Sequence, residues 1–145
     1  MKKLNKVSAV SLFILSILTS AVVNAATLII PPELEVQASG VVNGRHTQSL
    51  KLDAGKQLIE VTYRDLFADN ADDSGAWVKS SPLYFTVTLS DEDTYRIELP
   101  QINSKQQAES FLKQPKLKLL SDNGQVQAVM LMNHQQLMAK IWLDN

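Results

Sequence analysis

The sequence predicts a mainly β, α+β protein: an antiparallel β-sandwich-like domain with one short mid-chain helix and a C-terminal helix. Apolar and polar residues alternate with a period of two over much of residues 34–99, as half-buried strands require. Turn-forming residues separate the alternating segments, and the period becomes helical after Pro100 and near the C-terminus. The composition, 45% hydrophobic and 20% charged, is ordinary for a globular domain.

Residues 1–25 have the three-part pattern of an export signal. The first six residues include three lysines, residues 7–23 are largely apolar, and small enough side chains occupy the −3 and −1 positions before Ala26. We therefore expect cleavage between Ala25 and Ala26, which leaves one domain of residues 26–145 in the periplasm, or secreted. The alternative is an uncleaved anchor, but about 17 apolar residues is the lower limit for a membrane span, and no basic stop-transfer cluster follows.

The charge and cysteine content exclude several classes of partner and chemistry. The chain has 14 basic and 15 acidic residues, and loss of the three signal lysines would leave 11 and 15. A mildly acidic domain is poorly suited to nucleic acid, so we expect no nucleic-acid partner and no stable membrane anchor after processing. The absence of cysteine excludes disulfides, thiolate metal sites and a cysteine nucleophile.

The first half of the domain reads as strands joined by turns. Residues 34–38 alternate, and Asn43-Gly44 predicts a hairpin that returns through residues 47–52. A second turn is expected at residues 53–56, before an alternating strand over residues 59–63.

The central segments predict a second hairpin. Residues 83–89 and 94–99 both alternate, and the acidic residues 91–93 lie between them as a turn. Residues 64–81 form the long stretch without periodicity. One buried face is expected to contain Phe85, Val87, Ile97 and Leu99.

After Pro100 the pattern indicates a short helix, which begins with a Ser104–Gln107 capping box and ends before Pro115. A further hairpin should follow, with a turn at residues 122–124. Its return strand, 126–132, is almost continuously apolar, so we expect both of its faces to be covered.

The C-terminal residues predict a second helix. Asn133 is a suitable N-cap, and the pairs Leu137/Ile141 and Met138/Trp142 have i, i+4 spacing.

No motif predicts an enzyme, a cofactor or a metal site. His46 and His134 are the only histidines and neither lies in a zinc-binding motif; no serine lies in a Gly-x-Ser-x-Gly motif. Residues 70–75 match part of a calcium loop, but its twelfth position is Ser81, where a bidentate glutamate is needed. We interpret this segment as a solvated loop whose acidic residues, with an aromatic neighbour, contact a protein partner. That contact set is Asp69, Asp72, Asp73 and Trp77; the alternative for Trp77 is that it closes one end of the sheet core.

Two blocks of sequence resemble the YccT-like family of exported bacterial proteins, whose enterobacterial member is also called CsgI, a curli synthesis inhibitor. The first block contains Leu34-Glu35-Val36, Val42-Asn43-Gly44, residues 52–58 and Tyr63. The second contains Tyr95-Arg96-Ile97, Leu99-Pro100, Ala108-Glu109, Phe111 and residues 115–120. The resemblance runs from the signal to about Met132, and relatives generally continue with a further C-terminal region.

The resemblance implies an exported protein without enzymatic activity that interferes with curli assembly by contacting the curlin subunit. It supplies no motif of functional residues to place on this chain. The alternative is a periplasmic envelope module, either structural or binding carbohydrate or peptide, with no fibre partner.

Overall fold

The computed structural model describes residues 25–37, 46–68 and 75–144. In these ranges the chain forms strands throughout its length, with one helix in the middle and one near the end, so the predicted mainly β class is confirmed. The elements are β1 (Ala25–Ile30), β2 (Leu34–Val36), β3 (Gln48–Asp53), β4 (Gly55–Phe67), β5 (Ala76–Lys79), β6 (Leu83–Leu89), β7 (Thr94–Glu98), α1 (Lys105–Lys113), β8 (Lys116–Ser121), β9 (Val126–Met130) and α2 (His134–Leu143).

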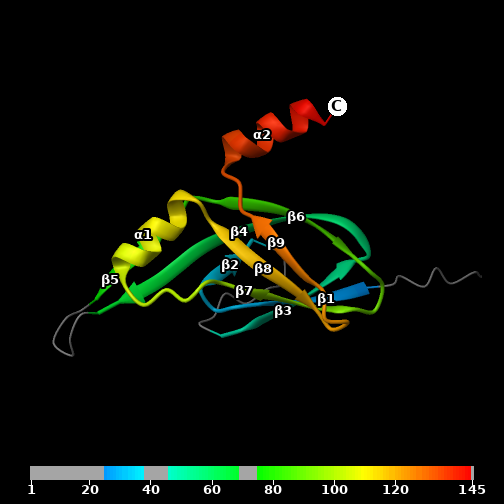
Figure 1. Ribbon diagram of the computed structural model, residues 1–145, viewed down its shortest axis with the longest axis horizontal. Helices are drawn as coiled ribbons and strands as arrows, with labels where there is room; N and C mark the ends of the chain where they lie inside the picture. The colour runs from blue at the N-terminus through cyan, green and yellow to red at the C-terminus, as the bar shows by residue number, and fades with distance from the viewer. Residues whose placement is uncertain (1–24, 38–45, 69–74, 145) are drawn as a thin grey trace, which may run out of the picture.

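The strands form two sheets (Figure 1). One has the order β3-β1-β7-β8-β9. The other is built on the long strand β4, with β2 on one side and β5 followed by β6 on the other, because Val61 pairs with both Val36 and Leu83. Most pairs are antiparallel as predicted, but β1 and β7 are parallel, with Leu28 opposite Tyr95.

The inward-facing residues of both sheets form the core. On β6, Phe85 and Val87 are buried, and on β7 Ile97 is buried, as the alternation predicts, whereas Leu99 is only partly covered. The predicted hairpin between these strands is wrong: β6 pairs with β4, and β7 pairs with β1 and β8. Each of these strands has one apolar face. Two strands in opposite sheets can bury these faces against each other across the core, just as two strands of one hairpin can bury them side by side.

The first predicted hairpin is also wrong in its pairing. Asn43 and Gly44 lie outside the described residues, and β2 pairs with β4 while β3 pairs with β1. The expected turn at residues 53–56 is a corner rather than a hairpin, since only Ala54 separates β3 from β4 and these strands lie in different sheets. Gly55 has φ of +103° there, a conformation that favours glycine.

The non-periodic stretch 64–81 contains the end of β4 and all of β5. A Ser80 hydrogen bond explains why β5 and β6 are separate strands: the Tyr63 amide donates to Ser80 Oγ (2.9 Å) instead of to a backbone carbonyl.

The mid-chain helix α1 is capped and packed much as predicted. Ser104 Oγ accepts a hydrogen bond from the Gln107 amide (3.2 Å), while the Gln107 side chain accepts from the Asn103 amide (2.7 Å), one residue earlier than in a capping box. α1 buries Ala108 and Phe111, and the Phe111 ring lies 5.4 Å from the Tyr63 ring. The helix therefore closes the end of the core beside β4 and β5 (Figure 1).

The β8–β9 hairpin forms as predicted around Gly124, but β9 is not covered on both faces. Val126 is 62% exposed and Met130 is 53% exposed, and only Val129 is buried in this strand. β9 is the edge strand of its sheet, and α2, which buries only Leu137 and contacts β6, leaves the outer face of β9 uncovered.

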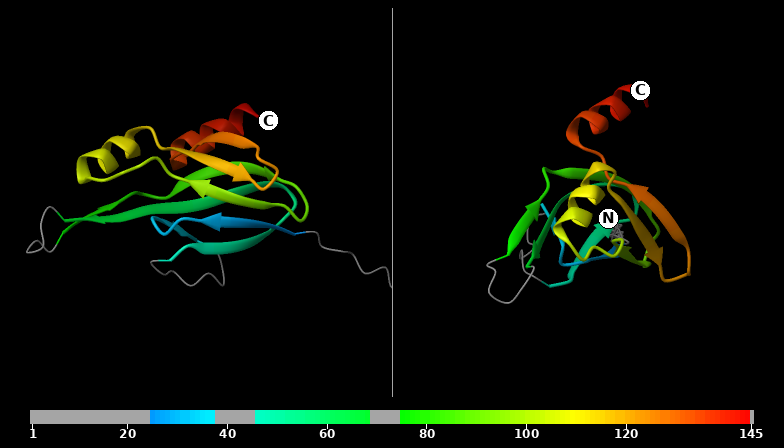
Figure 2. Two further views of the ribbon diagram at one scale, coloured as in Figure 1. Left: turned by 60° about the horizontal axis from the view of Figure 1, so that its bottom comes forward. Right: turned by 60° about the vertical axis from the view of Figure 1, so that its left-hand side comes forward.

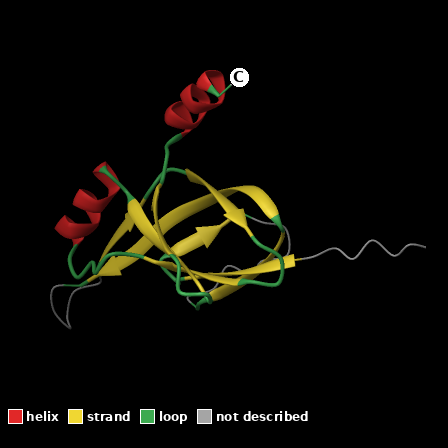
Figure 3. Cartoon of the chain, turned by 45° about the vertical axis from the view of Figure 1, so that its right-hand side comes forward, coloured by secondary structure: helices red, strands yellow, loops and turns green. Residues whose placement is uncertain are grey.

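The C-terminal helix begins with the predicted Asn133 cap, which forms a full capping box with Gln136. α2 buries only Leu137, and Figures 2 and 3 show it standing away from the sheets. No helix in the described part of the chain is long and apolar enough to cross a membrane.

Candidate functional site: an open strand edge and a neighbouring cleft

The predicted partner-contact residues are placed only in part by the structure. Asp69, Asp72 and Asp73 lie outside the described residues, in the connection between β4 and β5. Trp77 lies on β5 and is 46% exposed. The Arg64 guanidinium lies 4.3 Å from the centroid of a Trp77 ring, a cation–π contact.

Arg64 also forms an ion pair with Glu35 of β2, at an N···O distance of 3.0 Å. The three side chains thus form a row across β5, β4 and β2 on the outer face of this sheet. Trp77 thus contacts the ion-paired Arg64 at the end of the sheet where β5 begins.

The outer edge of β9 is a second candidate surface. Ser121 donates to the Gln125 carbonyl and Leu131 donates to the Pro115 carbonyl, so the odd-numbered residues of this strand bond to β8. In an antiparallel ladder the intervening residues direct their backbone groups the other way. The amides and carbonyls of Val126, Ala128 and Met130 therefore point away from β8, where no described strand pairs with them.

Within the described residues, this edge has none of the usual protective features. Soluble proteins generally guard exposed edges with lysine, proline, a bulge or a covering element. The β9 sequence Val-Gln-Ala-Val-Met contains no charge and no proline, and its outer face carries Val126, Ala128 and Met130. An apolar strand with free backbone groups is suited to pairing with an extended segment of another chain.

One end of the open edge is closed by a bridge to the other sheet. Met132, two residues beyond β9, exchanges backbone hydrogen bonds with Tyr84 of β6, and this bridge is isolated. The edge is thus fixed in space at its C-terminal end, and the His134 ring packs 6.3 Å from the Tyr84 ring just beyond it.

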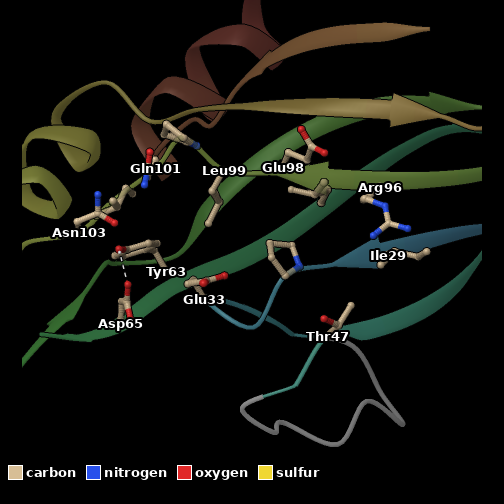
Figure 4. Close-up of a pocket in the computed structure, with 14 residues that line it drawn as sticks. Ile29, Glu33, Thr47, Tyr63, Asp65, Arg96, Glu98, Leu99, Gln101 and Asn103 are labelled. Carbon is tan, nitrogen blue, oxygen red and sulfur yellow. Dashed lines mark hydrogen bonds between the residues drawn. The ribbon is translucent and has the colours of Figure 1, made fainter. Parts of the chain in front are cut away.

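A cleft of about 500 Å³ lies between the β1–β2 connection, β4 and the segment after β7 (Figure 4). Glu33 and Asp65 lie toward one end of this cleft and Arg96 toward the other. Gln101 and Asn103 of the β7–α1 connection add amide groups, so the lining mixes charged, amide and aliphatic side chains.

The phenol of Tyr63 fixes one carboxylate of this cleft. Its hydroxyl donates to Asp65 Oδ2 (3.3 Å), and the Leu66 amide donates to Asp65 Oδ1 (2.8 Å). Burial raises the pKa of Tyr63 above its ordinary value, and the charges of Asp65 and Glu33 raise this pKa further. Tyr63 therefore remains a neutral donor, and Asp65 is a preoriented acceptor.

The described residues offer no constellation for metal binding: no group of three or more His, Asp or Glu side chains is close enough to hold an ion. His46 and His134, the two imidazoles considered from the sequence, are both exposed and far apart along the chain. The cleft of Figure 4 was not predicted, because its lining comes from several separate segments that no local motif connects.

The fold and these surfaces define a β-rich protein with an open edge, and the sequence places it in a family. Residues 27–141 match the family model described as "Uncharacterized protein conserved in bacteria (DUF2057)". The chain belongs to this family.

The curated relatives are UPF0319 proteins of Shewanella. One from Shewanella oneidensis is 31% identical over 121 residues, which cover 78% of this chain and 53% of the relative. One from Shewanella baltica is 30% identical over 121 residues, with 78% and 52% covered. The chain thus spans about half the length of these relatives. No solved structure matches it at a significant level.

Proposed function

We propose that the protein is an exported, non-enzymatic binding protein that captures an extended segment of another polypeptide by strand addition at β9. The observation that carries this proposal is the unguarded edge, where the three alternate residues Val126, Ala128 and Met130 present outward backbone groups and apolar side chains. Main-chain hydrogen bonds would supply affinity that depends little on the partner's sequence, and the apolar outer face would favour a β-forming segment.

The resemblance to the YccT-like family supports the curlin subunit as that partner. Amyloid fibres grow when a new strand pairs with the exposed strand at the fibre end. A soluble domain that pairs its own edge with a curlin segment blocks this step. Binding at the fibre end requires little protein, because ends are few, whereas sequestering monomer requires nearly equal amounts.

The test is the lag time of curlin fibre formation, followed by the fluorescence of an amyloid dye, with increasing amounts of the purified protein. We expect the lag to lengthen at equimolar ratio or below. Ala128→Pro removes an outward amide that β8 does not use and adds a ring to the edge, so this variant should lose most of the inhibition.

The matched control is Lys51→Pro on β3. The Thr27 amide donates to the Asp93 carbonyl, just before β7, so the backbone of Thr27 faces away from β3. The next residue, Leu28, is therefore the one that forms backbone hydrogen bonds with Leu50 of β3. Lys51 follows Leu50, so its amide points to the open side of β3. Lys51→Pro therefore makes the same backbone change at the opposite edge of the same sheet, with the loss of one surface charge in addition, and should inhibit like the wild type. Equal loss in both variants, or full inhibition by Ala128→Pro, would show that β9 is not the binding edge.

A second function is favoured by the cleft of Figure 4. Preoriented Asp65, together with the amides of Gln101 and Asn103, is the kind of polar lining that binds carbohydrate hydroxyls or peptide groups. An envelope module would use this cleft and would have no fibre partner. Unchanged curlin lag with the wild type at equimolar ratio, together with binding of a glycan or short peptide that Asp65→Asn abolishes, would favour this function.

A further inference from the structure

A second cavity, of about 660 Å³, lies on the other side of the β7–α1 connection. We name it the α1–β8 groove, since both elements line it, together with the β7–α1 connection. Its apolar lining includes Leu99, Ile102, Phe111 and Leu117. Its volume lies within the range of sites for small organic ligands.

The polar groups of this groove are predominantly cationic and amide. Lys116 and Lys118 are exposed on β8 and line it, against the single carboxylate of Glu98. Glu98 stands opposite Lys118 in the β7–β8 register, which leaves Lys116 opposite the uncharged Met130. The amides come from Gln101, Gln107 and Gln114.

We propose that the α1–β8 groove binds an anionic amphiphile, a molecule with an aliphatic chain and a carboxylate or similar head group. The apolar walls would cover the chain, and the ammonium groups of Lys116 and Lys118 would attract the head group. This site is chemically distinct from strand addition, because it uses side chains of α1, β8 and the β7–α1 connection rather than the outward backbone groups of β9, although Ala128 of β9 also lines it.

Two quantities follow from this chemistry. Each methylene removed from water adds about 0.8 kcal/mol, or roughly fourfold in affinity, until the chain exceeds the groove. The head-group contribution is a screened charge interaction at an exposed site, so it should weaken with salt.

The test uses dodecanoate and dodecyltrimethylammonium, which share a chain and differ in charge sign, titrated below micelle-forming concentrations into the full protein by calorimetry. We expect dodecanoate to bind at least tenfold more tightly than the cation, and decanoate to bind more weakly than dodecanoate. Backbone amide NMR shifts should locate the ligand at Phe111 and Leu117 rather than at the exposed apolar residues of α2.

Two variants and two matched controls complete the test. Ser110→Trp places a large ring in the groove from an exposed helix position, and should abolish binding. Gln106→Trp, outside the groove on the same helix, should not.

The double variant Lys116→Gln with Lys118→Gln tests the charges of the groove. It should weaken dodecanoate binding at least tenfold and reduce the salt dependence of that binding, whereas Lys113→Gln should change neither quantity. Equal binding of both amphiphiles, shifts confined to α2, or Ser110→Trp binding like the wild type would each overturn the proposal.

Discussion

Tyr84 and Met132 exchange two backbone hydrogen bonds, with N···O distances of 2.8 and 2.7 Å, and these bonds connect the two sheets of the sandwich. Beyond this bridge β6 stays paired to β4 and β9 stays paired to β8. Because the bridge is isolated, the rest of the β9 edge remains available for pairing, and the bridge holds that edge in a fixed position.

The first prediction concerns the core beneath this bridge. Phe85 is fully buried on β6, so Phe85→Ala should lower the free energy of unfolding by about 3–5 kcal/mol through lost burial and an unfilled cavity. Thr86 lies on the opposite face and is only partly covered, so Thr86→Ala should cost well under 1 kcal/mol. Chemical denaturation measures both; equal losses would mean that the outer face of β6 is also packed.

The sequence was sufficient to predict the burial patterns of β6 and β7 and the pairing of β8 with β9, but not the strand partners of β6 and β7. Alternation with a period of two fixes which side chains share a face, and it correctly placed Phe85 and Ile97 in the core. It carries no information about whether two such strands lie in one sheet or face each other across the core. The parallel β1–β7 pair joins segments far apart in sequence, which local turn signals cannot predict.

The surfaces were harder to predict for a related reason. A continuously apolar strand such as β9 is typical of a strand covered on both faces, but Val126 and Met130 are exposed because no described element packs closely over the outer face of this edge strand. Tyr63 ends the alternating strand expected over residues 59–63 and is buried, but its hydroxyl reaches Asp65 because β4 extends to Phe67, through residues without periodicity.

The second prediction concerns pH. An unfolded tyrosine ionises near pH 10, while the pKa of folded Tyr63 is raised by burial and by the carboxylate of Asp65. Above about pH 10 the unfolded chain loses a proton that the folded protein keeps, so the stabilisation present at lower pH is lost as the pH rises toward the folded pKa. Tyr63→Phe removes this linkage and keeps the ring against Phe111. Unfolding free energies measured from about pH 8 to about pH 11 should therefore fall more steeply for the wild type; parallel curves would contradict the assignment.

The third prediction compares the two helix caps. Removing an N-cap side chain destabilises a helix by about 0.5–2 kcal/mol. Since α1 buries Ala108 and Phe111, Ser104→Ala should lower the stability of the whole domain. Since α2 buries only Leu137, Asn133→Ala should speed amide hydrogen exchange within α2 and barely change global unfolding. Equal global losses would show that α2 is part of the cooperative core.

The fourth prediction concerns processing. Material recovered from the periplasm should begin at Ala26, as its intact mass would show, and a mass that includes Lys2 and Lys3 would contradict export by cleavage. Ala25 and Ala26 are the first residues of β1, and Ala26 is fully buried in a strand that lies between β3 and β7. A peptidase cannot reach this junction in the folded domain, so we expect cleavage to precede the pairing of β1.

The last prediction tests the acidic segment as part of the partner contact. Replacing Asp69, Asp72 and Asp73 with asparagine should weaken inhibition of curlin fibre formation and make it less sensitive to salt, because only screened charge interactions would be lost. Trp77 lies at the base of this segment and contacts Arg64, so it should remain in place in the triple variant.

A second triple variant makes the same charge change at exposed acids elsewhere: Glu92→Gln, Glu109→Gln and Asp144→Asn. If both triple variants inhibit equally, the effect belongs to net charge rather than to the segment. If only the first loses inhibition while Ala128→Pro abolishes it, the β9 edge supplies the pairing and the acidic segment accelerates encounter with the partner.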